Sequence, residues 1–170
     1  MHTENDITVR PAVISDLPAL LDIYNAEVTG SFSTFDTEPK SLGEREKWFY
    51  AHQGGRYILL TADFGGAAVG YASLSPYRPL DAYKGTVELS IYVRADMRRR
   101  GIAGMLMGEI LRMAEENPEI NTVVSVITSG NEASKRLHER FGFTFCGTMP
   151  DVGEKNGVSL GIDNFVLSVR

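Results

Sequence analysis

Residues 87–106, VELSIYVRADMRRRGIAGML, decide the fold of this chain. An apolar run that carries one carboxylate leads into a basic turn containing glycine, and a helical pattern begins directly after the turn. The first N–H groups of such a helix have no partners within it, and together with the helix dipole they attract an anion. The stretch therefore predicts a strand, an anion-binding turn and a helix in direct succession.

The composition of the turn favours an anion with phosphate groups. Small residues after the arginines allow a ligand to approach the backbone closely, and the arginines offer charge-assisted hydrogen bonds to phosphate oxygens. A surface turn with solvated arginines is the alternative, but the strand before the turn and the helix after it favour phosphate binding. The glycine spacing fits neither a Walker loop nor a Rossmann fingerprint. The candidate residues are Arg98, Arg99, Arg100, Gly101, Ile102, Ala103 and Gly104.

One carboxylate in the strand is a candidate general base. Strand alternation places Glu88, Ser90 and Tyr92 on one face. A carboxylate within an apolar strand needs partners or a water-filled cleft, because burying it alone is costly. Desolvation raises the pKa of such a group toward neutrality, which suits a base that acts on an amine. An ion pair at the edge of the sheet explains Glu88 equally well from spacing alone.

Histidine and cysteine give no sign of a metal site. His138 lies in the middle of a predicted helix, at the border of its packed face, where a lone histidine is more often structural or exposed than catalytic. His2 and His52 are not spaced as metal ligands with it, and no Cys/His cluster occurs, so we predict no metal. The single cysteine, Cys146, excludes a disulfide framework and fits a reducing cytoplasm, and we expect it in the core of a strand.

Composition and length exclude several classes of protein. The chain has 170 residues, 43% of them hydrophobic, which predicts a single domain over residues 1–170. A net charge of −5 argues against a general nucleic-acid binder. No apolar run follows a basic start in residues 1–10, so we predict no signal peptide. No stretch approaches the roughly 20 apolar residues of a membrane span.

The hydrophobic periods predict the element order β-α-α-β-β-β-α-β-α-β-β, which is a mixed sheet with helices on its faces. Ser15 is the predicted cap of the first helix, and Ser41 with Glu44 forms a capping-box pattern before the second. The strands are predicted at residues 7–10, 57–62, 67–74, 86–93, 123–128, 143–149 and 160–169. The third and fourth helices are predicted at residues 101–116 and 131–140.

Several segments resemble a known family. Residues 98–103 look like the acetyl-CoA loop of the GNAT superfamily, Arg/Gln-x-x-Gly-x-Gly/Ala, and residues 131–143 resemble the helix that follows it there. Within the superfamily the chain is most similar to the phosphinothricin N-acetyltransferase family, which includes methionine sulfone and sulfoximine acetyltransferases. The matching segments are STFDTEP at residues 33–39, AY at 82–83, TVE at 86–88, SIYV at 90–93 and NEASKRLH at 131–138.

The resemblance implies an α/β (α+β) GNAT fold, a single mixed, mostly antiparallel twisted sheet of six to seven strands with about four helices. It implies an enzyme, commonly a homodimer, that transfers acetyl from acetyl-CoA directly to the primary amine of a small amino-acid-like acceptor. A GNAT enzyme for a polyamine, an aminoglycoside or a protein N-terminus is an alternative. A non-catalytic acyl-CoA-binding module is another, and it would not need Glu88.

The resemblance also implies roles for individual residues. Glu88 would be the general base, acting through water, and His138 would stabilise the tetrahedral intermediate or protonate the leaving thiolate. The donor would be held by the turn at residues 98–104, by backbone groups of Ile91, Tyr92 and Val93, and by Asn131. The N–H of Val93 is the candidate donor to the thioester carbonyl. The acceptor pocket would be lined by Phe32, Phe35, Arg78 and Tyr83.

The chain departs from the family pattern at four places. Arg99 replaces the first glycine of the usual loop, which is compatible with the loop if φ at Arg99 is not positive. Leu89 follows the carboxylate where the family often has histidine, and Leu80 replaces an arginine near the acceptor. The carboxy-terminal family segment reads GVSLG at residues 157–161. Most of these departures lie in the acceptor half, so the resemblance supports acetyl transfer more strongly than phosphinothricin itself as acceptor.

Overall fold

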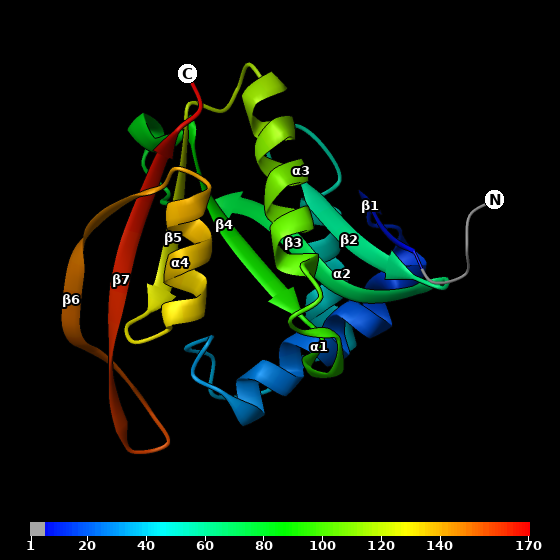
Figure 1. The fold of residues 1–170 in the computed structure, drawn as a ribbon, viewed down its shortest axis with the longest axis horizontal. Helices are drawn as coiled ribbons and strands as arrows, with labels where there is room; N and C mark the ends of the chain where they lie inside the picture. Colours follow the sequence, from blue (N-terminus) through cyan, green and yellow to red (C-terminus); the bar gives the residue numbers. More distant parts are fainter. Residues whose placement is uncertain (1–5) are drawn as a thin grey trace.

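A computed structural model describes residues 6–170, and Figure 1 shows its ribbon. The strands and helices follow the predicted order, with short 3-10 turns between some of them. The strands are β1 (Ile7–Pro11), β2 (Leu59–Phe64), β3 (Ala67–Pro76), β4 (Thr86–Val93), β5 (Thr122–Thr128), β6 (Thr144–Lys155) and β7 (Val158–Ser168). The helices are α1 (Leu17–Gly30), α2 (Leu42–Ala51), α3 (Ile102–Glu116) and α4 (Glu132–Arg140).

The seven strands form one sheet in the order β1-β2-β3-β4-β5-β7-β6. Neighbouring strands are antiparallel except β4 and β5, which are parallel. The predicted mixed, mostly antiparallel sheet with about four helices is therefore confirmed. The parallel ladder is short: it runs from Thr86 opposite Thr122 to Glu88 opposite Val124. Beyond these pairs the two strands splay apart, as Figure 1 shows, and this divergence positions the site.

Each face of the sheet has its own hydrophobic cluster. Helix α3 packs on β2, β3 and β4 through residues such as Leu106 and Ile110, which recur at helical spacing and are fully buried. Helices α1 and α2 pack on the other face, where Leu20 and Phe49 belong to one cluster with Tyr71 of β3. In Figure 1, α3 and α4 lie in front of the sheet and α1 and α2 behind it. The helices thus cover both faces and flank the divergence of β4 and β5.

The two predicted helix caps have different outcomes. Ser41 and Glu44 form the predicted capping box: Ser41 Oγ accepts from the Glu44 N–H at 3.3 Å, and Glu44 Oε2 accepts from the Ser41 N–H at 2.8 Å. The prediction that Ser15 caps α1 is wrong, because Ser15 lies inside a 3-10 turn that precedes the helix. The carboxylate of Asp16 closes that turn instead by accepting from the N–H of Val13 at 2.8 Å.

Strand β6 is longer and more exposed than predicted. The predicted strand ends at Met149, whereas β6 continues to Lys155 and pairs with β7. The prediction that Cys146 lies in the core is wrong, because the cysteine is exposed. Strand β6 is an edge of the sheet with a single neighbour, and its register shifts between Phe145 and Gly147. An edge strand with such a bulge can leave both of its faces in solvent.

Two predictions concern the amino terminus and the membrane. The segment 1–10, in which the sequence shows no signal-peptide pattern, begins before the described residues, and His2 lies outside them. None of the helices that the structure describes is long and apolar enough to cross a membrane. This second observation agrees with the hydropathy of the sequence.

Candidate functional site

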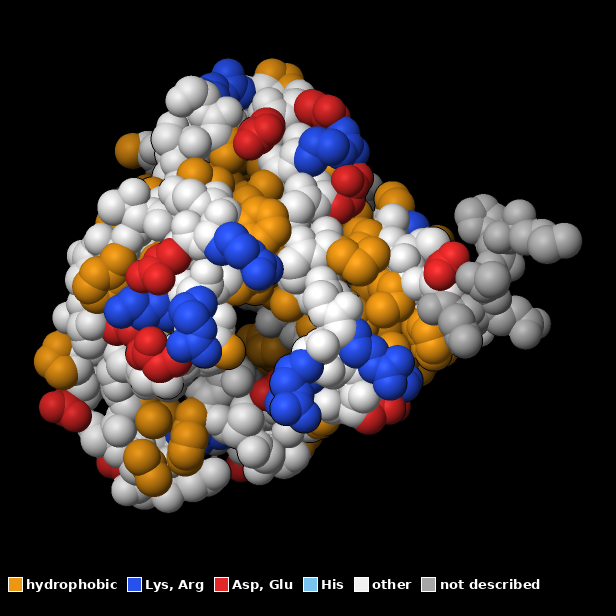
Figure 2. All heavy atoms as spheres, in the orientation of Figure 1, with side chains coloured by type: hydrophobic (Ala, Val, Ile, Leu, Met, Phe, Trp, Pro, Cys, Tyr) orange, Lys and Arg blue, Asp and Glu red, His pale blue; other side chains and the backbone are white. Residues whose placement is uncertain are grey.

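A cavity of about 830 Å³ opens where β4 and β5 diverge. It is bounded by the second half of β4, the turn before α3, the end of β5 and the first turns of α4. Figure 2 shows a hollow in this face of the molecule with Lys and Arg side chains on both sides of it. The sequence-predicted residues that line the cavity are Ile91, Tyr92, Val93, Arg98, Arg99, Gly101, Ile102, Ala103, Gly104, Asn131 and His138.

Strand β4 presents an open backbone edge to this cavity. The N–H of Arg94 donates to the carbonyl oxygen of Val69 at 2.9 Å, which sets the alternation of the antiparallel ladder between β3 and β4. By this alternation Tyr92 directs its backbone groups toward β3, whereas Ile91 and Val93 direct theirs toward the side of β5. Because β5 has diverged there, Ile91 and Val93 can offer backbone groups to an extended ligand.

The turn before α3 has space and donors for an anion. Gly101 is the N-cap of α3 with φ of +80°, in the left-handed region that favours glycine. No side chain caps the helix, and the first intrahelical bond runs from the Met105 N–H to the Gly101 carbonyl at 3.0 Å. The N–H groups of the three residues between them therefore lack intrahelical acceptors. A Cβ built on Gly101 meets no described atom within 4 Å.

The three arginines of the turn have different environments. Arg98 forms an ion pair with Glu27 of α1, and its Nε donates to the carbonyl oxygen of Val93 at 3.3 Å. Arg99 has φ of +61°, so the condition under which arginine replaces glycine without strain is not met. Arg100 is exposed and is not among the residues that line the cavity. The guanidinium of Arg98 is thus already bonded to protein groups, the Glu27 carboxylate and the Val93 carbonyl oxygen.

Helix α4 adds two cations that the sequence patterns did not identify as site residues. Arg136 and Arg140 line the cavity, one helical turn apart. A Cβ on Gly104 would lie 3.1 Å from Arg140 Nη2, so this guanidinium lies over the first turn of α3. Their i, i+4 spacing on a predicted helix places both guanidinium groups on one face, and this spacing could have identified them from the sequence. Asn131 caps α4, because its Oδ1 accepts from the N–H of Ser134 at 3.2 Å.

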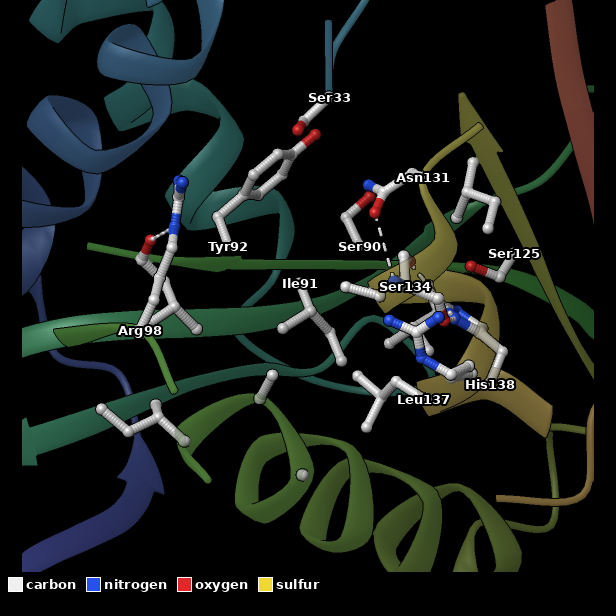
Figure 3. Close-up of a pocket in the computed structure, with 18 of the residues that line it drawn as sticks. Ser33, Ser90, Ile91, Tyr92, Arg98, Ser125, Asn131, Ser134, Leu137 and His138 are labelled. Atoms are coloured by element: carbon white, nitrogen blue, oxygen red, sulfur yellow. Dashed lines mark hydrogen bonds between the residues drawn. The ribbon is translucent and has the colours of Figure 1, made fainter. Parts of the chain in front are cut away.

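The ring of His138 is held in one tautomer. It is 4% exposed rather than at the border of a packed face, and it contacts the rings of Phe143 and Phe165. Its Nδ1 lies 2.7 Å from the carbonyl oxygen of Ser134, which can only accept, so Nδ1 carries the hydrogen. Burial lowers the pKa of His138, and its buried Nε2 has no hydrogen-bond partner among residues 6–170. The neutral ring therefore presents an acceptor, as the close-up in Figure 3 allows the reader to follow.

Glu88 lies at the last pair of the parallel ladder, where the two strands begin to separate. Its side chain is half-buried. Burial raises the pKa of Glu88, and the positive charge of Arg78 opposes this effect. Glu88 is not among the residues that line the 830 Å³ cavity. It therefore stands beside the apex of the cavity, on the strand face that carries Ser90 and Tyr92.

The residues predicted to form the acceptor pocket lie outside the cavity. Phe32 and Phe35 belong to the 31–41 loop between α1 and α2, and they are 40% and 37% exposed. The ring of Phe35 packs on Gly153 of β6 so closely that a Cβ there would lie 2.5 Å from it. Arg78 and Tyr83 lie in the connection between β3 and β4. The structure thus collects the predicted donor residues, Arg100 excepted, around one cavity and leaves the predicted acceptor residues in two separate segments.

The described part of the chain holds no group of three or more His, Cys, Asp or Glu side chains that could bind a metal ion. The prediction that no metal takes part rests on the sequence pattern, and the chemistry available at the site is that of carboxylate, imidazole, guanidinium and backbone groups. Such groups can bind an anion, accept a proton and donate hydrogen bonds to a carbonyl oxygen.

Comparisons with known proteins agree with this geometry. The sequence matches the profile of the acetyltransferase (GNAT) family over residues 17–143. It is 39% identical over 151 residues to an L-methionine sulfoximine/L-methionine sulfone acetyltransferase of Pseudomonas paraeruginosa, covering 88% of this chain and 87% of that protein. It is 40% identical over 156 residues to a phosphinothricin N-acetyltransferase of Streptomyces coelicolor, covering 89% and 90%. A crystal structure of a GNAT superfamily phosphinothricin acetyltransferase from Sinorhizobium meliloti in complex with acetyl-CoA superposes with a TM-score of 0.91 at 31% identity, covering 95% of this chain and 88% of that chain.

Proposed function

Because the chain belongs to the GNAT acetyltransferase family, we propose that it transfers acetyl from acetyl-CoA directly to the primary amine of a small amino-acid-like acceptor. The observation that carries this proposal is the cavity at the divergence of β4 and β5. One side of this cavity is an open strand edge, and one end is an uncapped helix N-terminus. A long, flexible cofactor whose amide-containing arm ends at a diphosphate fits such a surface.

The residues present fit the diphosphate and the pantetheine arm of acetyl-CoA. The free N–H groups at the start of α3 and the guanidinium of Arg140 would hold the diphosphate. Backbone groups of Ile91 and Val93 would pair with the amides of the pantetheine arm, in place of the missing strand neighbour. This places the thioester near the apex of the divergence, beside Glu88. The cofactor supplies the activated acetyl group, and the protein supplies position and proton transfer.

Glu88 would act as the general base. Its raised pKa suits it to take a proton, through water, from the ammonium group of the acceptor. The neutral amine nitrogen then forms a bond to the carbonyl carbon while the carbon–sulfur bond breaks. The nitrogen loses a second proton as the amide forms, and the leaving sulfur takes up that proton, so coenzyme A leaves as the free thiol. The N–H of Val93 would donate to the carbonyl oxygen as negative charge develops on it.

The tautomer of His138 favours a positioning role. Protonation of a leaving thiolate, or donation to an oxyanion, requires a hydrogen on Nε2, and the lowered pKa disfavours the form that has one. Neutral Nε2 can accept a hydrogen bond from an N–H of the cofactor arm or from a bound water. We therefore assign His138 to orienting the donor rather than to proton donation.

The names of the relatives supply the acceptor class. Methionine sulfoximine, methionine sulfone and phosphinothricin are small amino acids, and a carboxylate of that kind needs a cation near the amine. Arg78 is exposed, and its positive charge acts on Glu88, so Arg78 is the candidate cation. A polyamine or a protein N-terminus would not need it. A cytoplasmic homodimer is the setting that the family resemblance favours, and sedimentation of the purified chain tests the dimer.

Thiol release from acetyl-CoA, measured against a panel of amines, tests the proposed activity. We expect turnover with methionine sulfone or a similar amino acid, and little with spermidine, an aminoglycoside or a peptide. If the protein prefers one of these other amines, the proposal of an amino-acid-like acceptor is wrong. Release with none of the amines, despite tight binding of acetyl-CoA, would favour a non-catalytic module.

Replacement of Glu88 by Gln tests the base. Turnover is expected to fall by about 100-fold or more, while acetyl-CoA affinity changes by less than about twofold. Because burial raises the pKa of Glu88, wild-type kcat/KM should fall as the pH drops through that pKa, since the carboxylate gains a proton. In Glu88→Gln, kcat/KM should no longer fall in this way as the pH drops. Unchanged turnover in Glu88→Gln would show that another group is the base.

A further inference from the structure

A second carboxylate, Glu27 of α1, joins the two halves of the site. It is 7% exposed and lines the donor cavity. Sequence reasoning did not identify it, because nothing in its local pattern distinguishes it from other helical glutamates. A carboxylate this buried must have its oxygens satisfied by specific partners. The partners of Glu27 come from two loops that are far apart in the sequence.

One oxygen of Glu27 binds the donor side. Glu27 Oε1 pairs with Arg98 Nη2 of the turn before α3, and the same guanidinium donates from Nε to the carbonyl oxygen of Val93 at 3.3 Å. Figure 3 shows Arg98 reaching this carbonyl at the edge of the cavity. The donor turn and the open edge of β4 are therefore both tied to α1 through one guanidinium.

The other oxygen binds the start of the 31–41 loop. Ser31 Oγ donates to Glu27 Oε2 at 2.6 Å and accepts from the N–H of Ser33 at 3.0 Å. Ser33 lines the cavity, and in Figure 3 its hydroxyl faces the hydroxyl of Tyr92. Glu27 therefore fixes the first turn of the loop that carries Phe32 and Phe35 at the same time as it fixes Arg98.

We propose that Glu27 is a positioning residue that couples the donor turn to the 31–41 loop, so that binding of acetyl-CoA orders the acceptor side of the site. The inference rests on the proposed function. A diphosphate bound at the start of α3 restrains the turn at residues 98–101. Arg98 then holds the Glu27 carboxylate, and the carboxylate holds Ser31. Because the two oxygens serve different loops, Glu27→Met removes both bonds while keeping a side chain of similar length. Glutamine is unsuitable, because its oxygen can accept from Arg98 while its amide group donates to Ser31 Oγ.

Hydrogen exchange on the full chain, with and without acetyl-CoA, tests the coupling without knowledge of the acceptor. In the wild-type protein, acetyl-CoA should slow exchange at least threefold in peptides covering residues 31–41. In Glu27→Met this protection should disappear, while calorimetry shows acetyl-CoA affinity within about threefold of wild type. Equal protection in the variant would overturn the coupling. Loss of more than tenfold in affinity would also overturn it, because Glu27 would then be part of the donor site itself.

Lys155→Met is the matched control. Lys155 Nζ donates to the carbonyl oxygen of Thr34 at 2.8 Å and to the backbone carbonyl oxygen of Glu27 at 3.5 Å. It therefore restrains the same loop without bonding the Glu27 carboxylate or the donor turn. This variant should exchange faster in residues 31–41 in both states but keep the difference that acetyl-CoA causes. Loss of that difference here as well would show general loosening of the loop and would overturn the specific role of Glu27.

Steady-state kinetics give a second readout. Glu27→Met should raise the acceptor KM about fivefold with kcat within twofold. The effects of Ser31→Ala and Arg98→Met on that KM should be non-additive in the wild-type background and additive in the Glu27→Met background. Additivity in both backgrounds would overturn the proposal. A wild-type chain that binds no acetyl-CoA would overturn the proposed function and, with it, this inference, whereas binding without coupling overturns the inference alone.

Discussion

The donor half and the acceptor half of the site are built by different kinds of interaction. The donor half uses the open edge of β4 and the first turn of α3, which are backbone features of contiguous segments. The acceptor half uses side-chain bonds between distant segments: Thr128 donates to the carbonyl of Phe32, and Lys155 donates to that of Thr34, across 96 and 121 residues. A backbone site tolerates substitution around it, whereas a site held by side chains can change specificity with one substitution.

Gly101→Asp should break the donor half with the largest effect. The residue lies at φ of +80° at the uncapped start of α3, so Asp adds strain and a negative charge where a diphosphate would bind. Acetyl-CoA affinity should fall about 100-fold, or about 2.7 kcal/mol, by calorimetry. Gly101→Asn is the control, because it has a similar shape and tolerates the left-handed region better than most residues without a charge. Equal affinities of the Asp and Asn variants would contradict a phosphate at this position.

Gly153→Ala should disturb only the acceptor half. The new Cβ would lie 2.5 Å from the ring of Phe35, so the ring and its loop must move, at a cost of about 1–3 kcal/mol in unfolding free energy. We expect a several-fold rise in acceptor KM with acetyl-CoA affinity unchanged. In a Phe35→Ala background the same substitution should have little further effect. A full effect there would mean that Phe35 is not what the methyl group meets.

The pH dependence of stability gives a further test, since one buried histidine lies beside the donor cavity and another follows the C-terminus of α2. Burial lowers the pKa of His138 beside the donor cavity and of His52, which bonds Ser75 Oγ at 2.8 Å behind β3. The unfolded chain then binds more protons, so stability is complete above the unfolded pKa of about 6.5 and is lost as the pH falls below it. Urea unfolding should therefore show the free energy of unfolding falling as the pH is lowered from about 7.5 to about 5.5. His52→Asn and His138→Asn should each remove part of this dependence, and a pH dependence that survives both would assign it to other groups.

The smallest expected effect lies at the turn itself. Arg99 has φ of +61°, so Arg99→Gly relieves backbone strain and should raise the unfolding free energy by about 0.5 kcal/mol. Arg100→Gly is the matched control, because no positive φ occurs there, and it should lower stability by a similar amount. Thermal melts of the two variants measure the difference. A loss of stability in Arg99→Gly would show that the side chain contributes more than the strain costs.

Local patterns predicted the donor half well because its signals are local. Strand β4 has the predicted bounds, 86–93, and α3 begins one residue after the predicted start, with Gly101 as its cap. The capping box before α2 was equally clear. In each case the residues that determine the structure are within four positions of each other, so alternation and capping chemistry are sufficient to find them.

The remainder depends on which distant segments meet. The ion pair between Glu27 and Arg98 joins residues 71 positions apart, and no hydrophobic periodicity or motif in the sequence predicts it. The exposure of Cys146 follows from the place of β6 at the edge of the sheet, which depends on the strand order and not on the apolar residues around the cysteine. The positive φ of Arg99 depends on how the turn must fold to reach α3. The sequence therefore predicted the strand, turn and helix of the proposed donor site, but not the distant contacts that hold the 31–41 loop.

The short parallel ladder has a mechanical meaning as well. Three residue pairs join β4 to β5, whereas each other junction of the sheet has at least five. The sheet thus consists of two extensively paired groups of strands, β1–β4 and β5–β7–β6, which are joined by only these three pairs. Thermal bending concentrates where the fewest hydrogen bonds resist it. Such bending would change the width of the cavity between β4 and β5 before any other distance in the sheet.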